Sequence, residues 1–186
     1  MVAYINWNRR IADFLTGLRL VIAGFILFLG FSFGAEALAS VSLLFLIGWT
    51  TDSLDGYFAR RDYSRYRSWL SEHDRLVDTI MILSGWIYLA VSGYITQWIA
   101  LLYPLGATAI IYKFPSKAVL SIVEVIPVLR IPMVTLAQHP LLGYLWIIWA
   151  IGAVILNRRC LKVRLTYLWN DFRNLKKRKI NELFKS

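Results

Sequence analysis

The chain has 186 residues, of which 58% are apolar and only 17% are charged, and its mean hydropathy is +0.55. Soluble globular domains usually contain about half apolar and about a quarter charged residues, so the composition argues against both a soluble enzyme and a disordered chain. Basic residues outnumber acidic ones by 21 to 11, a net charge of +10, and the single cysteine excludes an intrachain disulfide. The composition therefore predicts a small helical membrane protein.

Apolar stretches long enough to cross a bilayer as helices follow one another along the chain. Before the first of them, residues 1–12 carry Tyr4 and Trp7 beside Arg9 and Arg10, which predicts a short helix at the level of the lipid headgroups. No segment alternates like a strand of a membrane barrel. We expect an all-α integral membrane bundle of six transmembrane helices, at residues 13–31, 36–56, 74–94, 96–113, 117–137 and 140–158.

The basic residues indicate how these spans are oriented. Arginine and lysine occur before the first span and in the connectors after the second, fourth and sixth spans, whereas the connectors around Gly34, Gly93 and Gln138 contain neither. The positive-inside rule then places both termini, and the arginine-rich connector after the second span, on the cytoplasmic side. We expect the protein in the cytoplasmic (inner) membrane.

Residues 159–186 are expected to form a basic tail after a single membrane domain over residues 1–158. From Arg158 onward the chain holds ten basic and two acidic residues, a net charge of +8, and its leucines recur at helical spacing. Such a segment next to a membrane predicts an amphipathic helix, or a solvated one, facing anionic lipid headgroups. We expect no nucleic-acid partner.

Four aspartates lie where the second span ends and the third begins. Residues three or four apart share a helix face, so Asp52 with Asp55, and Asp74 with Asp78, are expected to point into one gap on the same membrane side. Carboxylates gathered there need a compensating cation, and hard oxygen ligands suit Mg²⁺, Mn²⁺ or Ca²⁺. Taken singly, each aspartate is better explained as a helix cap or as a partner of a nearby arginine. The two helix-spaced pairs together favour a metal site that binds phosphate.

The residues between the two pairs fit a phosphate pocket. Gly56 permits a close approach of backbone or ligand, Ala59 keeps the same helix face shallow, and Arg60 offers a forked donor for phosphate oxygens.

This arrangement resembles the signature of the CDP-alcohol phosphotransferase family, class I. The matching pattern is Asp52-x2-Asp55-Gly56-x2-Ala59-Arg60 followed by Asp74-x3-Asp78. The family signature also has a glycine four residues before its third aspartate, where this chain has Leu70. At the start of the first span, Asp13-Phe-Leu15-Thr16-x2-Arg19 is similar to the Asn-x-Leu-Thr-x2-Arg of many members.

The resemblance implies transfer of a phosphatidyl group from CDP-diacylglycerol to an alcohol, with release of CMP, by a six-helix protein that is usually dimeric. It implies two Mg²⁺ or Mn²⁺ ions held by the four aspartates, with Asp78 also acting as general base. Gly56, Ala59 and Arg60 are carried over as nucleotide contacts, and Thr16 and Arg19 as first-span support for the same site. Phosphatidylglycerophosphate synthase is the leading expectation by analogy, with inositol phosphate, serine or phosphatidylglycerol as other acceptors.

Three cations are candidates for holding a phosphorylated acceptor. Lys113 and Lys117 lie between the fourth and fifth spans, where each is equally well explained as a topology signal. Arg130 lies deeper in the fifth span and has two alternatives, an ion pair with Glu124 or a side chain that extends outward to the interface.

Two other functions remain open from the sequence. A cation channel or transporter would place acidic residues through the depth of the membrane, whereas the aspartates gather at one side beside Gly56 and Arg60; Glu124 in the fifth span keeps this alternative open. An inactive lipid-binding relative would result if Leu70 blocked the nucleotide.

Overall fold

The computed structural model describes residues 7–59, 73–114, 116–156, 158 and 166, and these form helices joined by short turns. The elements are α1 (Trp7–Phe33), the 3₁₀-helix η1 (Gly34–Ala37), α2 (Leu38–Ala59), α4 (Asp74–Val91), α5 (Gln97–Lys113), α6 (Lys117–Gln138) and α7 (Pro140–Leu156). Each predicted span coincides with one of these α-helices. The expected all-α fold is therefore confirmed.

The number of membrane crossings stays a prediction. By length and composition two helical stretches are suited to cross a bilayer, Arg10–Leu54, which contains α1 and α2, and Val119–Gln138 in α6. Pro140–Leu156 is apolar but shorter. The tail over residues 159–186 lies outside the described residues, apart from Thr166.

The predicted short helix over residues 1–12 is not a separate element in its described part. Trp7 to Ala12 form the start of α1, which continues without interruption to Phe33. The stretch contains neither glycine nor proline and so lacks a residue that would end the helix before the apolar run.

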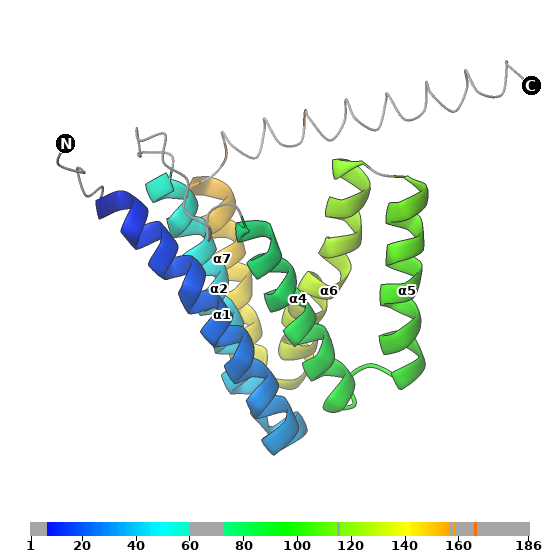
Figure 1. Cartoon of the computed structure of the whole chain (residues 1–186). Helices are drawn as coiled ribbons and strands as arrows, with labels where there is room; N and C mark the ends of the chain where they lie inside the picture. Colours follow the sequence, from blue (N-terminus) through cyan, green and yellow to red (C-terminus); the bar gives the residue numbers. More distant parts are fainter. Residues whose placement is uncertain (1–6, 60–72, 115, 157, 159–165, 167–186) are drawn as a thin grey trace, which may run out of the picture.

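Helices α1, α2 and α4 form the centre of the bundle (Figure 1). Gly34 allows the chain to reverse between α1 and α2 because it adopts φ +54°, a left-handed conformation that costs glycine little. Helix α6 packs on α4 and α2, α7 packs mainly on α6, and α5 stands at the edge against α4 and α6. The end of α2 and the starts of α4 and α6 consequently lie on the same side of the bundle.

The core is apolar and contains a small polar network that joins three helices. Ser42 of α2 accepts hydrogen bonds from Thr135 of α6 at 3.1 Å and from the Trp146 indole of α7 at 2.8 Å. All three side chains are buried, so the bonds satisfy polar groups that would otherwise be costly to bury. This network fixes α6 and α7 against α2.

The outer surface of the bundle is lined with large exposed apolar side chains. Such an extensive apolar surface is unusual for a soluble monomer and suits contact with lipid. Examples are Phe14, Phe25 and Phe28 on α1, Leu101 and Leu105 on α5, and Leu141 and Ile148 on α7.

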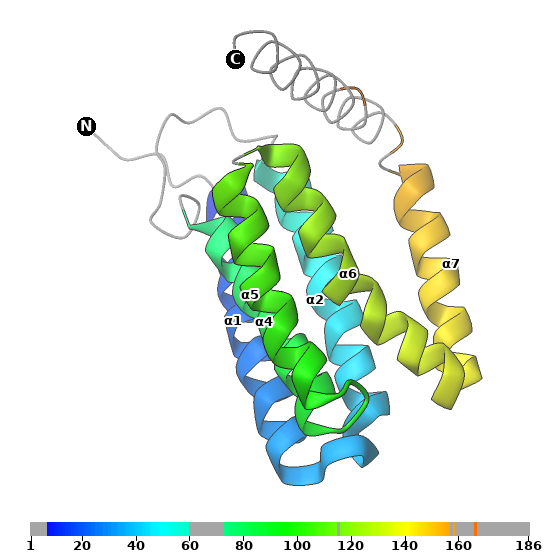
Figure 2. The same cartoon turned by 90° about the vertical axis from the view of Figure 1, so that its right-hand side faces the viewer.

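Helix α6 bends where it carries two prolines, Pro127 and Pro132. It begins beside α2 and turns toward α7 in its second half (Figure 2). Because Pro127 has no N–H, the carbonyl of Val123, four residues earlier, loses its helical hydrogen bond. The hydroxyl of Tyr103 on α5 donates to that carbonyl. This contact satisfies the freed backbone group and ties α5 to α6 at the bend.

Candidate active site

Three carboxylates converge at the end of the bundle where α2 ends and α4 begins. Asp52 of α2 and Asp74 and Asp78 of α4 each offer an oxygen atom, and these atoms lie within 4.8 Å of one another. The side chains are 45%, 44% and 40% exposed, respectively, so a ligand can reach them. The structure thus brings together three of the four aspartates that the helical spacing predicts.

The other residues of the predicted motif are only partly described. Asp55, Gly56 and Ala59 belong to α2, but their side-chain positions lie outside the described part of the chain. Arg60 and Leu70 fall in the undescribed connector between α2 and α4. Their predicted roles stay predictions.

Arg19 of α1 joins the three carboxylates. Its Nη1 atom lies 2.9 Å from Asp52 Oδ1 and also contacts Asp78 Oδ1, while its Nη2 atom lies 2.6 Å from Asp74 Oδ1. Arg19 is fully buried, and its guanidinium stays charged under all ordinary conditions. One cation from α1 thus contacts every described member of the cluster, and the role of Arg19 in supporting the site stays a prediction.

Thr16 lies one turn before Arg19 and connects it to the backbone of α1. Its hydroxyl donates to the carbonyl of Ala12 at 3.1 Å and accepts from Arg19 Nη2 at 3.3 Å. The same hydroxyl lies 3.5 Å from Asp74 Oδ1, at the outer limit of a hydrogen bond. Thr16 is buried and thus restricts the orientation of the guanidinium. The sequence spacing Thr16-x2-Arg19 places both side chains on the same face of α1.

An apolar contact connects α2 and α4 next to the cluster. Gly48 lies one turn before Asp52, and Met81 lies one turn after Asp78. A Cβ atom on Gly48 would come within 2.3 Å of Met81 Cε, so only glycine permits the present spacing without a shift of the methionine. The Met81 side chain therefore occupies the space beside the Gly48 backbone, one turn away from the carboxylates.

A cleft of about 360 Å³ opens beside the cluster, between α2, α4 and α6. Asp52, Asp78 and Arg19 line one part of it, and Trp49, Ser121 and Glu124 line another. From the sequence, Glu124 was a possible partner for Arg130 and a feature that a channel would share, and neither Trp49 nor Ser121 was placed at the site. Trp49 could have been noticed because it lies three residues before Asp52 and so shares its helix face.

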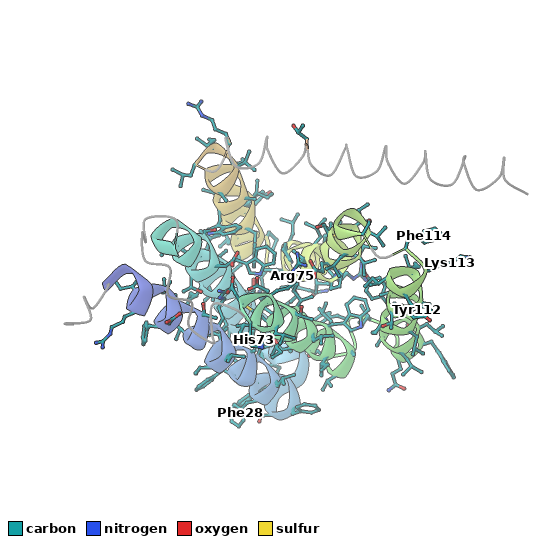
Figure 3. All side chains as sticks on the ribbon, turned by 45° about the horizontal axis from the view of Figure 1, so that its top comes forward. Phe28, His73, Arg75, Tyr112, Lys113 and Phe114 are labelled. Atoms are coloured by element: carbon teal, nitrogen blue, oxygen red, sulfur yellow. The ribbon has the colours of Figure 1, made fainter. Side chains whose placement is uncertain are left out.

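Two of the three candidate cations for an acceptor phosphate, Lys113 and Arg130, do not line this cleft. The ammonium of Lys113 is 5.8 Å from the centre of the Phe114 ring, and Figure 3 shows both residues at the outer edge of α5, away from His73 and Arg75 at the start of α4. Arg130 is exposed and does not line the cleft. The position of the Lys117 side chain is outside the described residues.

Of the two alternatives for Arg130, the ion pair with Glu124 is not formed among the described residues, and the Arg130 side chain is exposed. The two residues are six positions apart, which places them about 120° apart around a helix. Their helical spacing explains why the pair does not form.

The donor set fits a Mg²⁺ or Mn²⁺ ion. Such hard cations prefer carboxylate oxygens, and three of these converge here from two helices. With all groups ionised, three carboxylates and one guanidinium leave a net charge of −2, which a single divalent cation would neutralise. The simple alternative, that the aspartates pair with an arginine, also holds in the structure, because Arg19 contacts all three. The two features are compatible because all three carboxylates are partly exposed and Asp52 and Asp78 line the cleft.

Comparison with known proteins supplies independent information. No curated protein and no solved structure was found to match the chain. The model of the CDP-alcohol phosphatidyltransferase family, however, matches residues 9–157. This region includes Arg19, the three converging aspartates and the whole cleft. The chain therefore belongs to the CDP-alcohol phosphatidyltransferase family.

Proposed function

We propose that this protein transfers a phosphatidyl group from CDP-diacylglycerol to an alcohol and releases CMP. Membership of the family supports phosphatidyl transfer from a CDP-alcohol to an acceptor. The observation that carries the proposal is the convergence of Asp52, Asp74 and Asp78 beside a cleft at one end of the bundle. A channel would require acidic groups through the depth of the membrane, whereas these three lie together at one end of the bundle; Glu124, farther along α6, is a feature that a channel would share.

The metal ligands in this proposal are Asp52, Asp74 and Asp78, with Asp55 as the predicted fourth. A second ion remains part of the proposal, because Asp55 would extend the carboxylate set. When bound, Mg²⁺ or Mn²⁺ neutralises negative charge on the diphosphate and on the departing CMP. The protein contributes the fixed arrangement of the oxygen donors.

Asp78 is proposed as the general base. The acceptor oxygen forms a bond to the phosphorus that carries the diacylglycerol, the bond from that phosphorus to the CMP oxygen breaks, and CMP leaves with the electron pair. The hydroxyl proton passes to the Asp78 carboxylate, which lines the cleft and is therefore accessible to a bound alcohol. Its contact with Arg19 restricts the orientation of the carboxylate.

Arg19 and Thr16 are proposed to position the carboxylates from α1. Gly56, Ala59 and Arg60 are proposed to contact the nucleotide, on the basis of the family motif that they match. The acyl chains of the donor would extend sideways into the bilayer, since the outer surface of the helices is apolar. The protein then needs to enclose only the polar half of the lipid.

The cellular setting belongs to the same proposal. The family is membrane-embedded. We place this member in the cytoplasmic membrane with both termini and the active site on the cytoplasmic side, in agreement with the distribution of basic residues. A homodimer, a membrane domain over residues 1–158 and a tail on anionic lipids complete the proposal.

The decisive experiment incubates the purified protein with CDP-diacylglycerol and Mn²⁺ or Mg²⁺, and measures CMP release with a panel of alcohols. Glycerol 3-phosphate, the acceptor of the phosphatidylglycerophosphate synthase expected by analogy, belongs in the panel. We expect CMP release that requires both the metal and an acceptor, together with a new phospholipid. Failure to release CMP with every alcohol, in protein shown to be folded, would contradict the proposal.

A further inference from the structure

Glu124 is an acidic residue of the cleft that the proposed reaction does not use. It lies seven residues into α6, about 10 Å along the helix axis from its start. It is half-buried and lines the same cleft as Asp52 and Asp78. Within the described chain its carboxylate forms no ion pair and no hydrogen bond.

Glu124 lies within Val119–Gln138, a stretch that is suited by length and composition to cross a bilayer. Isolated charges in the bilayer interior cost several kcal/mol, so acidic side chains there usually face a cavity and bind something. Arg19, the described cation of the cleft, already contacts three aspartates. The position therefore suits a cationic ligand that enters the cleft.

Trp49 offers a second group in the cleft that can bind a cation, through the face of its indole ring. Its side chain lines the cleft with Glu124. The Trp49 ring packs edge-on against Trp149, with centroids 6.4 Å apart, and the Trp149 indole donates to Thr50 at 2.9 Å. These contacts restrict the Trp49 ring, and an indole attracts ammonium groups through its electron-rich face.

We propose that the acceptor is an alcohol that carries an ammonium group, with Glu124 as its counter-ion and Trp49 as its aromatic contact. This inference rests on the proposed phosphatidyl transfer. Both ends of such an acceptor find a complementary group in one cleft, because the hydroxyl can face Asp78 while the ammonium faces Glu124. The site would then prefer such an acceptor to other alcohols because of its positive charge.

The proposal departs from the glycerol phosphate expected by analogy. A phosphorylated acceptor would place a second negative charge beside Glu124, where like charges repel. Lys113 and Arg130, two of the cations expected to hold its phosphate, do not line the cleft. The described lining is thus better matched to a positive acceptor than to a negative one.

The test compares four acceptors in the CMP-release assay, choline and ethanolamine as cations, glycerol as a neutral alcohol, and glycerol 3-phosphate as an anion. We expect kcat/KM for the better of the two cations to exceed that for glycerol by at least about 10-fold. In Glu124→Gln the KM for the cations should rise by about 10-fold with little change in kcat, while the constants for glycerol stay the same. Glu36→Gln, at an exposed glutamate of η1, is the matched control and should change nothing.

Binding measured without turnover separates this inference from the proposed function. Choline chloride is titrated into the folded protein by calorimetry, and we expect binding that Glu124→Gln and Trp49→Leu each weaken. Thermal unfolding of both variants establishes that they fold. Preference for glycerol 3-phosphate, or choline binding that is equal in wild type and Glu124→Gln, would overturn the inference while CMP release still supports phosphatidyl transfer. Choline binding that depends on Glu124, without CMP release from any alcohol, would support the ammonium site and contradict the proposed function.

Discussion

Two acidic regions face the same cleft and differ in how their charge is balanced. Asp52, Asp74 and Asp78 share one buried guanidinium, which reaches them from a third helix. Glu124 lines the cleft from α6, without an ion pair in the described chain. The aspartates are thus held in place by the protein itself, whereas Glu124 is left for a ligand.

This difference separates two tasks of a transferase. The aspartate cluster is preorganised because Arg19 partly offsets its mutual repulsion before any metal arrives. Preorganised charges need little rearrangement during a reaction, which is where catalytic electrostatics are most effective. The charge of Glu124 is not balanced by a cation of the described chain, so a cationic acceptor can balance it. Glu124 is therefore suited to selection of the acceptor.

The largest expected effect follows from Asp78→Asn. Asparagine keeps the shape of the side chain but cannot take the proton, so we expect kcat to fall by about 10²- to 10⁴-fold. The variant should still bind CDP-diacylglycerol. This binding is measured as the increase in melting temperature that the lipid causes. Turnover close to the wild-type rate would remove Asp78 from the role of base.

Replacement of Arg19 tests whether the protein balances the aspartates. Arg19→Met retains much of the apolar stem but removes the charge, so the metal-free protein should lose on the order of 3 kcal/mol of unfolding free energy. Mn²⁺ should then raise the melting temperature of the variant more than that of the wild type, since the metal replaces the lost positive charge.

The matched control for Arg19 is Arg10→Met, the same change at an exposed position of α1. It should leave both the stability and the response to Mn²⁺ unchanged. An equal Mn²⁺ response in Arg19→Met and the wild type would show that the guanidinium and the metal do not act on the same carboxylates.

A smaller effect is expected at the bend of α6, which positions the backbone next to Glu124. Tyr103→Phe leaves the Val123 carbonyl without its donor and should cost about 1–3 kcal/mol. In a Pro127→Ala background the restored N–H can bond to that carbonyl, so the penalty of Tyr103→Phe should shrink. Melting temperatures of the wild type, the two single variants and the double variant measure this coupling. Equal penalties in both backgrounds would mean that the hydroxyl does not compensate for the proline.

The smallest effect is expected from Lys113→Ala. Lys113 lies against Phe114 at the edge of α5, so its removal should leave KM unchanged for cationic and anionic acceptors alike. A selective rise in the KM for glycerol 3-phosphate would bring Lys113 into the acceptor site and weaken the contrast with Glu124.

The sequence predicted the helices well because apolar runs of membrane length have few alternative structures. It also indicated that Asp74 and Asp78 face one gap with Asp52, since residues three or four apart share a helix face. It did not reveal that Arg19 contacts all three aspartates. Helical spacing shows which residues of α1 share a face, but it does not show which other helices pack against that face. Lys113 was assigned from its position in a connector, which says nothing about the direction of its side chain.

The contact between Gly48 and Met81 links the packing of the bundle to its chemistry. It lies one helical turn below Asp52 and Asp78 and contains no charged atom. A larger residue at position 48 would displace the Met81 side chain, which lines the cleft next to the acid groups. The shape of the cleft beside the acid groups consequently depends on a position that carries no side chain.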